Sequence, residues 1–248
     1  DCSNISKDDL VIEIGPGLGT LTKELLEKAG KVVAIELDKK MLSILKDRFS
    51  LYHNFSLINK DVLKVDLNQL IKEEKEKNGF KRAKIVANLP YYITTPIIMK
   101  LLEEKLDLES ITVMIQKEVA DRLVAIPGEK DTGAITYSVY YYSEAESVLE
   151  VPNNSFIPEP EVTSKVIKLN IRKEAPVEVK SRKVMFRIIK CAFMQRRKTL
   201  LNALVNAKVF LNKEEGLKIL KELNLDENIR AEKLNLQNFA DITNKILK

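Results

Sequence analysis

The 248-residue sequence contains little cysteine, histidine or tryptophan, and these shortages exclude several classes of protein. There are two cysteines, one histidine and no tryptophan. Cys2 and Cys191 are too few for the disulfide framework of a small secreted domain, and neither has metal-ligand spacing around it. With His53 as the lone histidine, the sequence argues against a His-based metal site and a Ser-His-Asp triad. We therefore expect no resident metal.

Long apolar runs are also missing. No stretch approaches the roughly 20 residues that cross a bilayer. The first ten residues include three aspartates and do not resemble a signal peptide. We therefore expect a cytoplasmic protein that does not bind membranes. Hydrophobic residues still make up 45% of the chain, which is enough for a buried core in one large domain with a small appendage.

Acidic residues are scarce in one segment. Residues 176–213 contain ten Lys and Arg against a single acid, Glu178, although the net charge of the whole chain is only +5. A basic block of this kind indicates a polyanionic partner, and a solvated helix face is the common alternative. Because solvated faces normally mix both signs of charge, we favour nucleic acid.

The first two thirds of the chain alternate short apolar runs with helical patterns, which predicts a parallel sheet covered by helices. Strands are expected at residues 10–14, 32–35, 55–58, 84–87, 111–115, 136–142 and 165–171, the last two as an antiparallel pair. Helices alone are expected after residue 175, at residues 181–206, 213–223 and 236–247. We predict an α/β domain over residues 1–175 and a small all-α domain over residues 176–248.

A glycine-rich turn, Gly15-Pro16-Gly17-Leu18-Gly19, directly follows the first expected strand. Glycines allow a ligand to approach the backbone N–H groups because no Cβ stands in the way. The G-x-G-x-G spacing differs from the G-x-G-x-x-G of dinucleotide enzymes, which disfavours an NAD-linked oxidoreductase. Taken alone, the glycines are equally compatible with a ligand site and with a tight turn that binds no ligand.

Two carboxylates strengthen the case for a cofactor site. Glu36 ends the second expected strand, about 20 residues after the glycines, where an acid can accept hydrogen bonds from ribose hydroxyls. Asp61 follows the third strand at the same carboxyl edge, although either acid alone could be a strand end or a helix cap. Glycine turn, Glu36 and Asp61 in this order match the Rossmann-like class I methyltransferases. We therefore predict S-adenosylmethionine as cofactor, with Leu37 and Val62 as further contacts.

The fourth expected strand ends in Asn88-Leu89-Pro90-Tyr91, which resembles the [Asp/Asn/Ser]-x-Pro-[aromatic] motif of methyltransferases that act on amino groups. The Asn88 side-chain oxygen and the Leu89 carbonyl can accept hydrogen bonds from the two N–H groups of an adenine amine. These bonds would direct the lone pair of the amine nitrogen at a methyl donor. Pro90 stiffens the turn, and Tyr91 offers a ring for an extruded base. Phe156, in a proline-rich loop, is a candidate for the other side of the base. An ordinary turn and a core phenylalanine are the alternatives.

With these motifs the chain resembles the ribosomal RNA adenine N6-dimethyltransferase family along almost its whole length. The segments that carry the resemblance are residues 13–19, 35–38, 88–93, 116–119, 156–164 and 192–200. The last segment is similar to the branch that acts on small-subunit rRNA. It is less similar to the large-subunit branch, which confers macrolide resistance.

The resemblance implies dimethylation of two adjacent adenosines in a 3′-terminal hairpin of small-subunit rRNA, within a pre-ribosomal particle. We also expect the protein to be a monomer. It also implies that Gly15, Glu36, Asp61 and Asn88 contact the cofactor, with Asp61 at the cofactor's adenine amine. Family members usually begin with a basic arm carrying a Gly-Gln-Asn-Phe-Leu-like segment. This sequence begins at Asp1, so we expect two cofactor contacts to be missing.

The expected helix over residues 181–206 provides the candidate RNA-binding surface. The basic residues on it that we expect to contact RNA are Arg187, Lys190, Arg196, Arg197 and Lys198. Its apolar stripe consists of Phe186, Ile189, Phe193, Leu200 and Leu204. Arg197 and Lys198 could instead stabilise packing between the domains. Two other functions stay open: methylation of large-subunit rRNA, and a ribosome-assembly checkpoint in which docking matters more than turnover.

Overall fold

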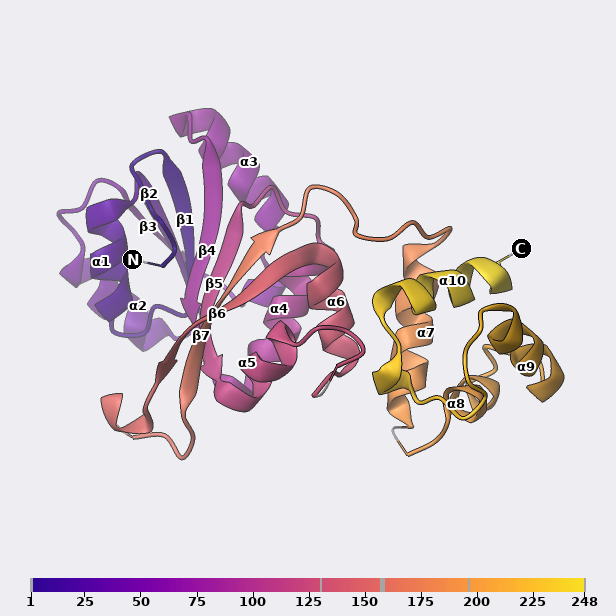
Figure 1. The fold of residues 1–248 in the computed structure, drawn as a ribbon. Helices are drawn as coiled ribbons and strands as arrows, with labels where there is room; N and C mark the ends of the chain where they lie inside the picture. The colour runs from indigo at the N-terminus through magenta and orange to yellow at the C-terminus, as the bar shows by residue number, and fades with distance from the viewer. Residues whose placement is uncertain (1, 130, 157–158, 196, 248) are drawn as a thin grey trace. The chain divides into compact units, whose positions relative to one another are not determined.

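The computed structural model describes residues 2–129, 131–156, 159–195 and 197–247, and the strands among them form a seven-stranded sheet (Figure 1). The strands are β1 (Asp9–Ile14), β2 (Lys31–Glu36), β3 (Phe55–Asn59), β4 (Arg82–Asn88), β5 (Ser110–Gln116), β6 (Ser143–Val151) and β7 (Ser164–Ile171). They lie in the order β3-β2-β1-β4-β5-β7-β6. The first five are parallel and β7 is antiparallel to β5, which confirms the predicted Rossmann-like class.

The parallel strands form where the sequence has mainly apolar runs, because helices cover both faces of this part of the sheet. Every residue of β1 is buried, and so is every residue of β2 except the first. Figure 1 shows α1 (Thr20–Lys28) and α2 (Lys39–Arg48) on one face, with α3 (Leu67–Asn78) and α4 (Thr94–Glu103) on the other. The carboxyl ends of these strands therefore meet at one edge, where ligands of open α/β sheets bind.

An ionic cluster lies at the opposite edge of the sheet and consists of buried Asp9 and Lys84 with the partly exposed Arg82 and Glu109. Lys84 is 1% exposed, and its Nζ donates to Asp9 Oδ2 at 3.1 Å and to the Asn4 carbonyl at 2.6 Å. Arg82 Nε donates to Asp9 Oδ1 at 2.6 Å, and Lys84 Nζ lies 3.3 Å from Glu109 Oε1. These contacts attach the segment before β1 to β4 and β5.

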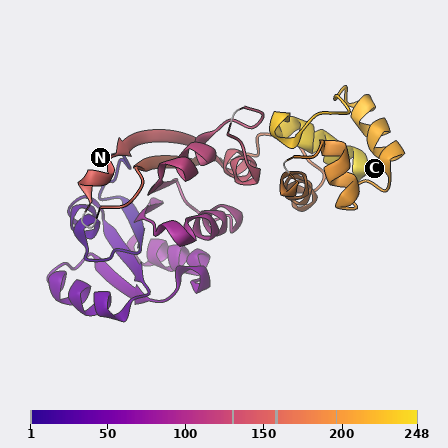
Figure 2. The ribbon, with the colours of Figure 1, turned by 90° about the horizontal axis from the view of Figure 1, so that it is seen from below.

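The described residues form two compact units. One unit contains Asp1–Ala120 and Glu144–Ile171, including the whole sheet apart from Ser143, the first residue of β6. The other contains Asp121–Ser143 and Arg172–Lys248. Its helices are α6 (Ala134–Tyr142), α7 (Arg182–Met194), α8 (Leu200–Asn206), α9 (Lys213–Glu222) and α10 (Leu236–Ile246), and those from α7 onward cluster together (Figure 2). A separate apolar core holds this unit together.

The strand expected at residues 136–142 is wrong, since this segment belongs to helix α6. The aromatic and β-branched residues that suggest a strand pack instead into the core of the helical unit. Tyr137 is fully buried, and its hydroxyl donates to the carbonyls of Leu234 at 2.6 Å and Ala231 at 3.2 Å. Tertiary packing here overrides a local preference of the chain.

The same tyrosine explains why the compact units differ from a single division at residue 175. The Tyr137 ring packs edge-on against Phe239, with ring centroids 5.1 Å apart, and lies 5.4 Å from the Phe193 ring. These contacts place Asp121–Ser143 with the C-terminal helices, although this segment precedes β7 in the chain.

The single helix expected over residues 181–206 is also wrong, because the chain forms two helices there. Helix α7 ends at Met194 and α8 begins at Leu200. Thr199 begins the second helix as its N-cap, with its hydroxyl accepting a hydrogen bond from the Asn202 N–H at 3.3 Å. The basic residues 197 and 198 therefore lie in a turn between two helices.

Candidate active site

The glycine turn leaves β1 at the carboxyl edge of the sheet in a conformation that requires glycine. Gly15, Gly17 and Gly19 have φ angles of 66°, 56° and 80°, in the left-handed region. A Cβ on Gly15 or Gly17 would meet no atom within 4 Å, so both have open space beside them that a ligand can enter. A Cβ on Gly19 would come within 2.5 Å of the Phe49 ring, so this glycine is required by the packing of α2.

Glu36, the last residue of β2, connects the glycine turn to the start of α2. Its side chain is largely buried, with 8% of the residue exposed. Oε1 accepts hydrogen bonds from the N–H groups of Leu37 and Asp38, both at 2.8 Å, and Oε2 accepts one from Gly17 at 3.3 Å. The structure therefore brings Glu36 and the glycine turn together, as the order of the motifs predicts. Leu37 is 64% exposed beside them.

Asp61 lies two residues after β3, at the same edge. Its Oδ1 accepts a hydrogen bond from the Leu63 N–H at 3.0 Å and so caps the short 3-10 helix η1 (Val62–Lys64). The capping role that we considered as the alternative is thus present. Asp61 is half-buried and Val62 is buried, and both lie just after the end of β3.

Glu13 lies in β1 directly before the glycine turn, and sequence analysis notes it only as part of a family segment. It is 1% exposed, and the Thr22 hydroxyl donates to its Oε2 at 2.7 Å. Burial raises the pKa of Glu13 to about 7, against an opposing effect of the Thr22 hydrogen bond and a further increase from the charge of Glu36. A carboxyl group that titrates near neutral pH thus lies beneath the candidate cofactor site.

Asn88 ends β4 with an exposed side chain, and the next three residues form one wall of a pocket of about 290 Å³. The residues that line this pocket are Asn88, Leu89, Pro90, Tyr91, Phe156 and Pro160. Phe156 is 68 positions from Asn88 in the chain, and the loop between β6 and β7 returns it to the end of β4. All five residues predicted for catalysis therefore meet at a single pocket.

Hydrogen bonds from neighbouring elements hold the Asn88–Tyr91 turn in place. The Leu89 N–H donates to the carbonyl of Met114 in β5 at 3.2 Å, and the Thr94 hydroxyl donates to the Pro90 carbonyl at 3.1 Å. The Tyr91 hydroxyl lies 2.8 Å from Oγ of Ser164, a buried residue at the start of β7. The Tyr91 ring thus has a fixed position at the pocket wall. Sequence analysis missed Ser164 as its partner, because nothing in the chain order relates the two residues.

The predicted RNA-binding residues that the structure describes all lie at the surface of the helical unit. Arg187 and Lys190 are exposed on α7, and Arg197 and Lys198 are exposed in the turn after it. Arg196 lies outside the described residues. Within the expected apolar stripe, Ile189, Leu200 and Leu204 are buried, whereas Phe186 and Phe193 are partly buried.

Among the described residues, no group of three His, Cys, Asp or Glu side chains is arranged to hold a metal ion. In the same part of the chain, no helix has both the length and the apolar character that crossing a membrane requires.

Comparisons with known proteins identify relatives along the whole chain. Residues 1–248 match the ribosomal RNA adenine dimethylase family. A protein named ribosomal RNA small subunit methyltransferase A from Lachnoclostridium phytofermentans is 50% identical over 246 residues, covering 98% of this chain and 84% of the relative. A protein of the same name from Clostridioides difficile is 49% identical over 244 residues, covering 98% and 83%.

Two solved structures resemble the whole chain. A dimethyladenosine transferase from Plasmodium falciparum aligns with a TM-score of 0.77 and 27% identity, over 96% of this chain and 90% of that one. The 23S rRNA methyltransferase ErmE aligns with a TM-score of 0.73 over 100% and 94% of the two chains. At 21% identity, the second likeness concerns the fold alone.

Proposed function

The chain belongs to the ribosomal RNA adenine dimethylase family, and from this membership we propose that it transfers methyl groups from S-adenosylmethionine to N6 of two adjacent adenosines in small-subunit rRNA. The observation that carries the proposal is the pocket in which Phe156 meets the Asn88–Tyr91 turn. An amide oxygen beside two aromatic rings suits a planar base with an exocyclic amine.

The residues at the glycine turn fit S-adenosylmethionine. The open sides of Gly15 and Gly17 admit its methionine and ribose parts. Among the described residues, Gly17 alone donates to Glu36 Oε2, through a long hydrogen bond of 3.3 Å, so this oxygen is suited to accept from a ribose hydroxyl. Asp61 would accept from the adenine amine, with Leu37 and Val62 beside the adenine ring. When bound, the cofactor supplies an electrophilic methyl group on a sulfonium sulfur.

In the proposed mechanism the Asn88 side-chain oxygen and the Leu89 carbonyl accept hydrogen bonds from the two N–H groups of the target adenine amine. The amine nitrogen would then become more tetrahedral, with its lone pair free to attack the methyl group. The N–C bond would form as the S–C bond breaks, and the methylated amine would then lose a proton to solvent. Tyr91 and Phe156 hold the extruded base between their rings, and Ser164 keeps Tyr91 in place through its hydroxyl. No strong general base is required before the methyl group moves.

Residues 1–175 are the proposed catalytic domain and residues 176–213 carry the proposed RNA contact. Exposed cations at Arg187, Lys190, Arg197 and Lys198 would bind phosphates of the rRNA. The names of relatives near 50% identity favour small-subunit rRNA over large-subunit rRNA. We further propose that the protein acts as a monomer on a pre-ribosomal particle in the cytoplasm.

Transfer of tritium from labelled S-adenosylmethionine tests which rRNA is the acceptor. Small and large ribosomal subunits from cells that lack this modification are incubated separately with the protein. We expect label in small-subunit rRNA, and two dimethylated adenosines on digestion of that RNA. Label confined to large-subunit rRNA would contradict the assignment. Stable docking on small subunits with no incorporation would favour the checkpoint role.

A further inference from the structure

Asn59 ends β3 between the two acids assigned to the nucleoside part of the cofactor. Its side-chain Nδ2 donates to the carbonyl of Glu36 at 2.8 Å and to the carbonyl of Leu37 at 3.1 Å. Asn59 pairs with Glu36 in the register of the two parallel strands. The Asn59 amide therefore donates to backbone carbonyls at the end of β2, where the hydrogen bonds between the backbones of β2 and β3 end.

The bonds from Asn59 complete a set that holds the turn at residues 36–38 from both sides. The Glu36 carboxylate accepts from the N–H groups of Leu37 and Asp38, while the Asn59 amide donates to the carbonyls of Glu36 and Leu37. The Glu36 carbonyl also accepts from the Lys60 N–H at 3.2 Å. The position of the Glu36 carboxylate, and with it the Gly17 contact, thus depends on this frame.

Asp61 follows Asn59 by two residues and is itself fixed to η1 by its bond to Leu63. Any shift between the ends of β2 and β3 would therefore change the separation between the Glu36 and Asp61 carboxylates. We infer that Asn59 is a positioning residue for cofactor binding: it sets the spacing of the two acids that hold the nucleoside part of S-adenosylmethionine. This inference rests on the proposed function.

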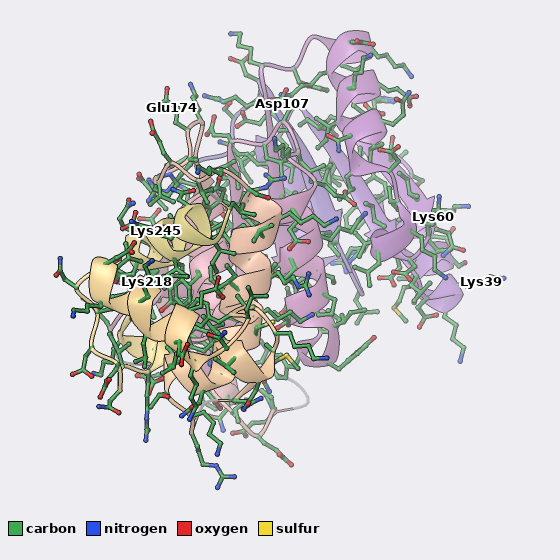
Figure 3. The ribbon with its side chains drawn as sticks, turned by 90° about the vertical axis from the view of Figure 1, so that its right-hand side faces the viewer. Lys39, Lys60, Asp107, Glu174, Lys218 and Lys245 are labelled. Carbon is green, nitrogen blue, oxygen red and sulfur yellow. The ribbon has the colours of Figure 1, made fainter. Side chains whose placement is uncertain are left out.

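The chemistry requires a hydrogen-bond donor at this position. Two carbonyl oxygens accept hydrogen bonds from the Asn59 side chain, so the side-chain group at this position must be a donor. An aspartate of the same shape would place an acceptor against both carbonyls. Because Asn59 is exposed, substituting it opens no cavity in the core. Figure 3 shows the neighbouring Lys60 at the surface of the sheet unit.

A matched control lies just before the other end of the same strand. Asn54 immediately precedes β3, at the opposite edge of the sheet from the glycine turn. Its Nδ2 also donates to two backbone carbonyls, those of Leu26 at 3.0 Å and Ala29 at 3.2 Å. A purely structural role for these asparagines predicts similar consequences for both. A positioning role predicts that only Asn59 affects the cofactor.

The experiment measures binding of S-adenosylmethionine and S-adenosylhomocysteine by calorimetry to the wild-type chain and to Asn59→Ala, Asn59→Asp and Asn54→Ala. Thermal melting of each variant is recorded in parallel. We expect Asn59→Ala to weaken both ligands about tenfold, Asn59→Asp to weaken them at least as much, and Asn54→Ala to change them less than about twofold. In methyl transfer, Asn59→Ala should raise KM for the cofactor about tenfold and leave kcat within about twofold.

Equal affinities in Asn59→Ala and Asn54→Ala would overturn the inference, and so would a loss of kcat without a change in KM. If Asn59→Ala does not fold, Asn59→Ser keeps the site polar and serves the same comparison. Absence of binding by the wild-type chain is a separate outcome, because it contradicts the cofactor assignment under the proposed function before any variant is compared.

Discussion

Among single residues, Glu36 combines two roles, because it is both a candidate cofactor ligand and a structural partner of the glycine turn. We expect Glu36→Ala to weaken S-adenosylmethionine binding by on the order of 1.5–3 kcal/mol, as for a charge-assisted hydrogen bond. It also removes the acceptor for the N–H groups of Gly17, Leu37 and Asp38, so the melting temperature should fall as well. Calorimetry with unchanged affinity would contradict the assignment.

Glu13 gives a pH dependence whose sign follows from its raised pKa. Below about pH 4.5 the carboxyl is protonated in both the folded and unfolded chain and has no cost. Between pH 4.5 and the folded-state pKa of about 7, only the unfolded chain loses the proton, so the free energy of unfolding falls. The loss reaches on the order of 3 kcal/mol by pH 8.

The Glu13→Gln substitution removes this titration and keeps an acceptor for the Thr22 hydroxyl. The variant should therefore gain stability relative to wild type as the pH rises from 5 to 8. Urea denaturation at several pH values measures the difference. A difference that stays constant across this range would show that the Glu13 carboxyl does not titrate as its burial implies.

At the scale of the element, the ionic cluster at the amino edge makes a testable contribution to stability. Lys84→Met removes one cationic partner of buried Asp9 and leaves Arg82 in place, and should cost about 1–3 kcal/mol. Lys81→Met is the control, because Lys81 and Asp8 form an exposed pair worth less than about 1 kcal/mol. Denaturation midpoints that fall equally in the two variants would contradict the role of burial.

Strands were predictable where the sequence has a mainly apolar run. The predictions for the five parallel strands are confirmed. Strands β1, β2, β4 and β5 are mostly buried, whereas β3, at the edge of the sheet, is only partly buried. Strand β6 was missed because it lies at the edge of the sheet and has mostly exposed or partly exposed residues, which leave no apolar run. Helix α6 was mistaken for a strand because its aromatic residues serve a core formed by distant helices.

The same reasoning separates the predictable part of the candidate site from the rest. Glu36, Asp61 and Asn88 each end or follow a strand, so their common edge follows from a parallel sheet. The position of Phe156 at the Asn88 pocket could be expected from the family resemblance but not from spacing. Asn59 carries no signal in the sequence, since an exposed asparagine at a strand end is common and its two carbonyl partners belong to another strand.

At the scale of the whole molecule, the basic turn after α7 should determine how binding to small subunits depends on salt. Each phosphate contact contributes a slope of about 0.7–0.9 in a plot of log affinity against log salt concentration. Replacing Arg197 and Lys198 with alanine should flatten this slope and leave S-adenosylmethionine affinity unchanged. Replacing Lys218 and Lys221 is the control, because these exposed residues lie on α9 outside the basic block, and Figure 3 shows Lys218 there.

Melting temperature, measured on the same variants, distinguishes RNA docking from a role in packing. If Arg197 and Lys198 stabilise packing, their replacement should lower the melting temperature and leave the salt slope as it is in wild type. That pair of results would contradict the docking proposal. A flatter slope with an unchanged melting temperature would support it.

The central claim is that methyl transfer to an adenine amine takes place in the Asn88 pocket. Single-turnover methyl transfer by Asn88→Ala tests this claim most directly. The measurement uses saturating S-adenosylmethionine and unmodified small subunits, with N6,N6-dimethyladenosine quantified by mass spectrometry. Asn78→Ala, an exposed asparagine at the end of α3, is the control. We predict a rate lower by roughly 10²–10³ for Asn88→Ala, with RNA affinity retained and some loss of cofactor affinity. A rate near that of wild type under these conditions would contradict the account.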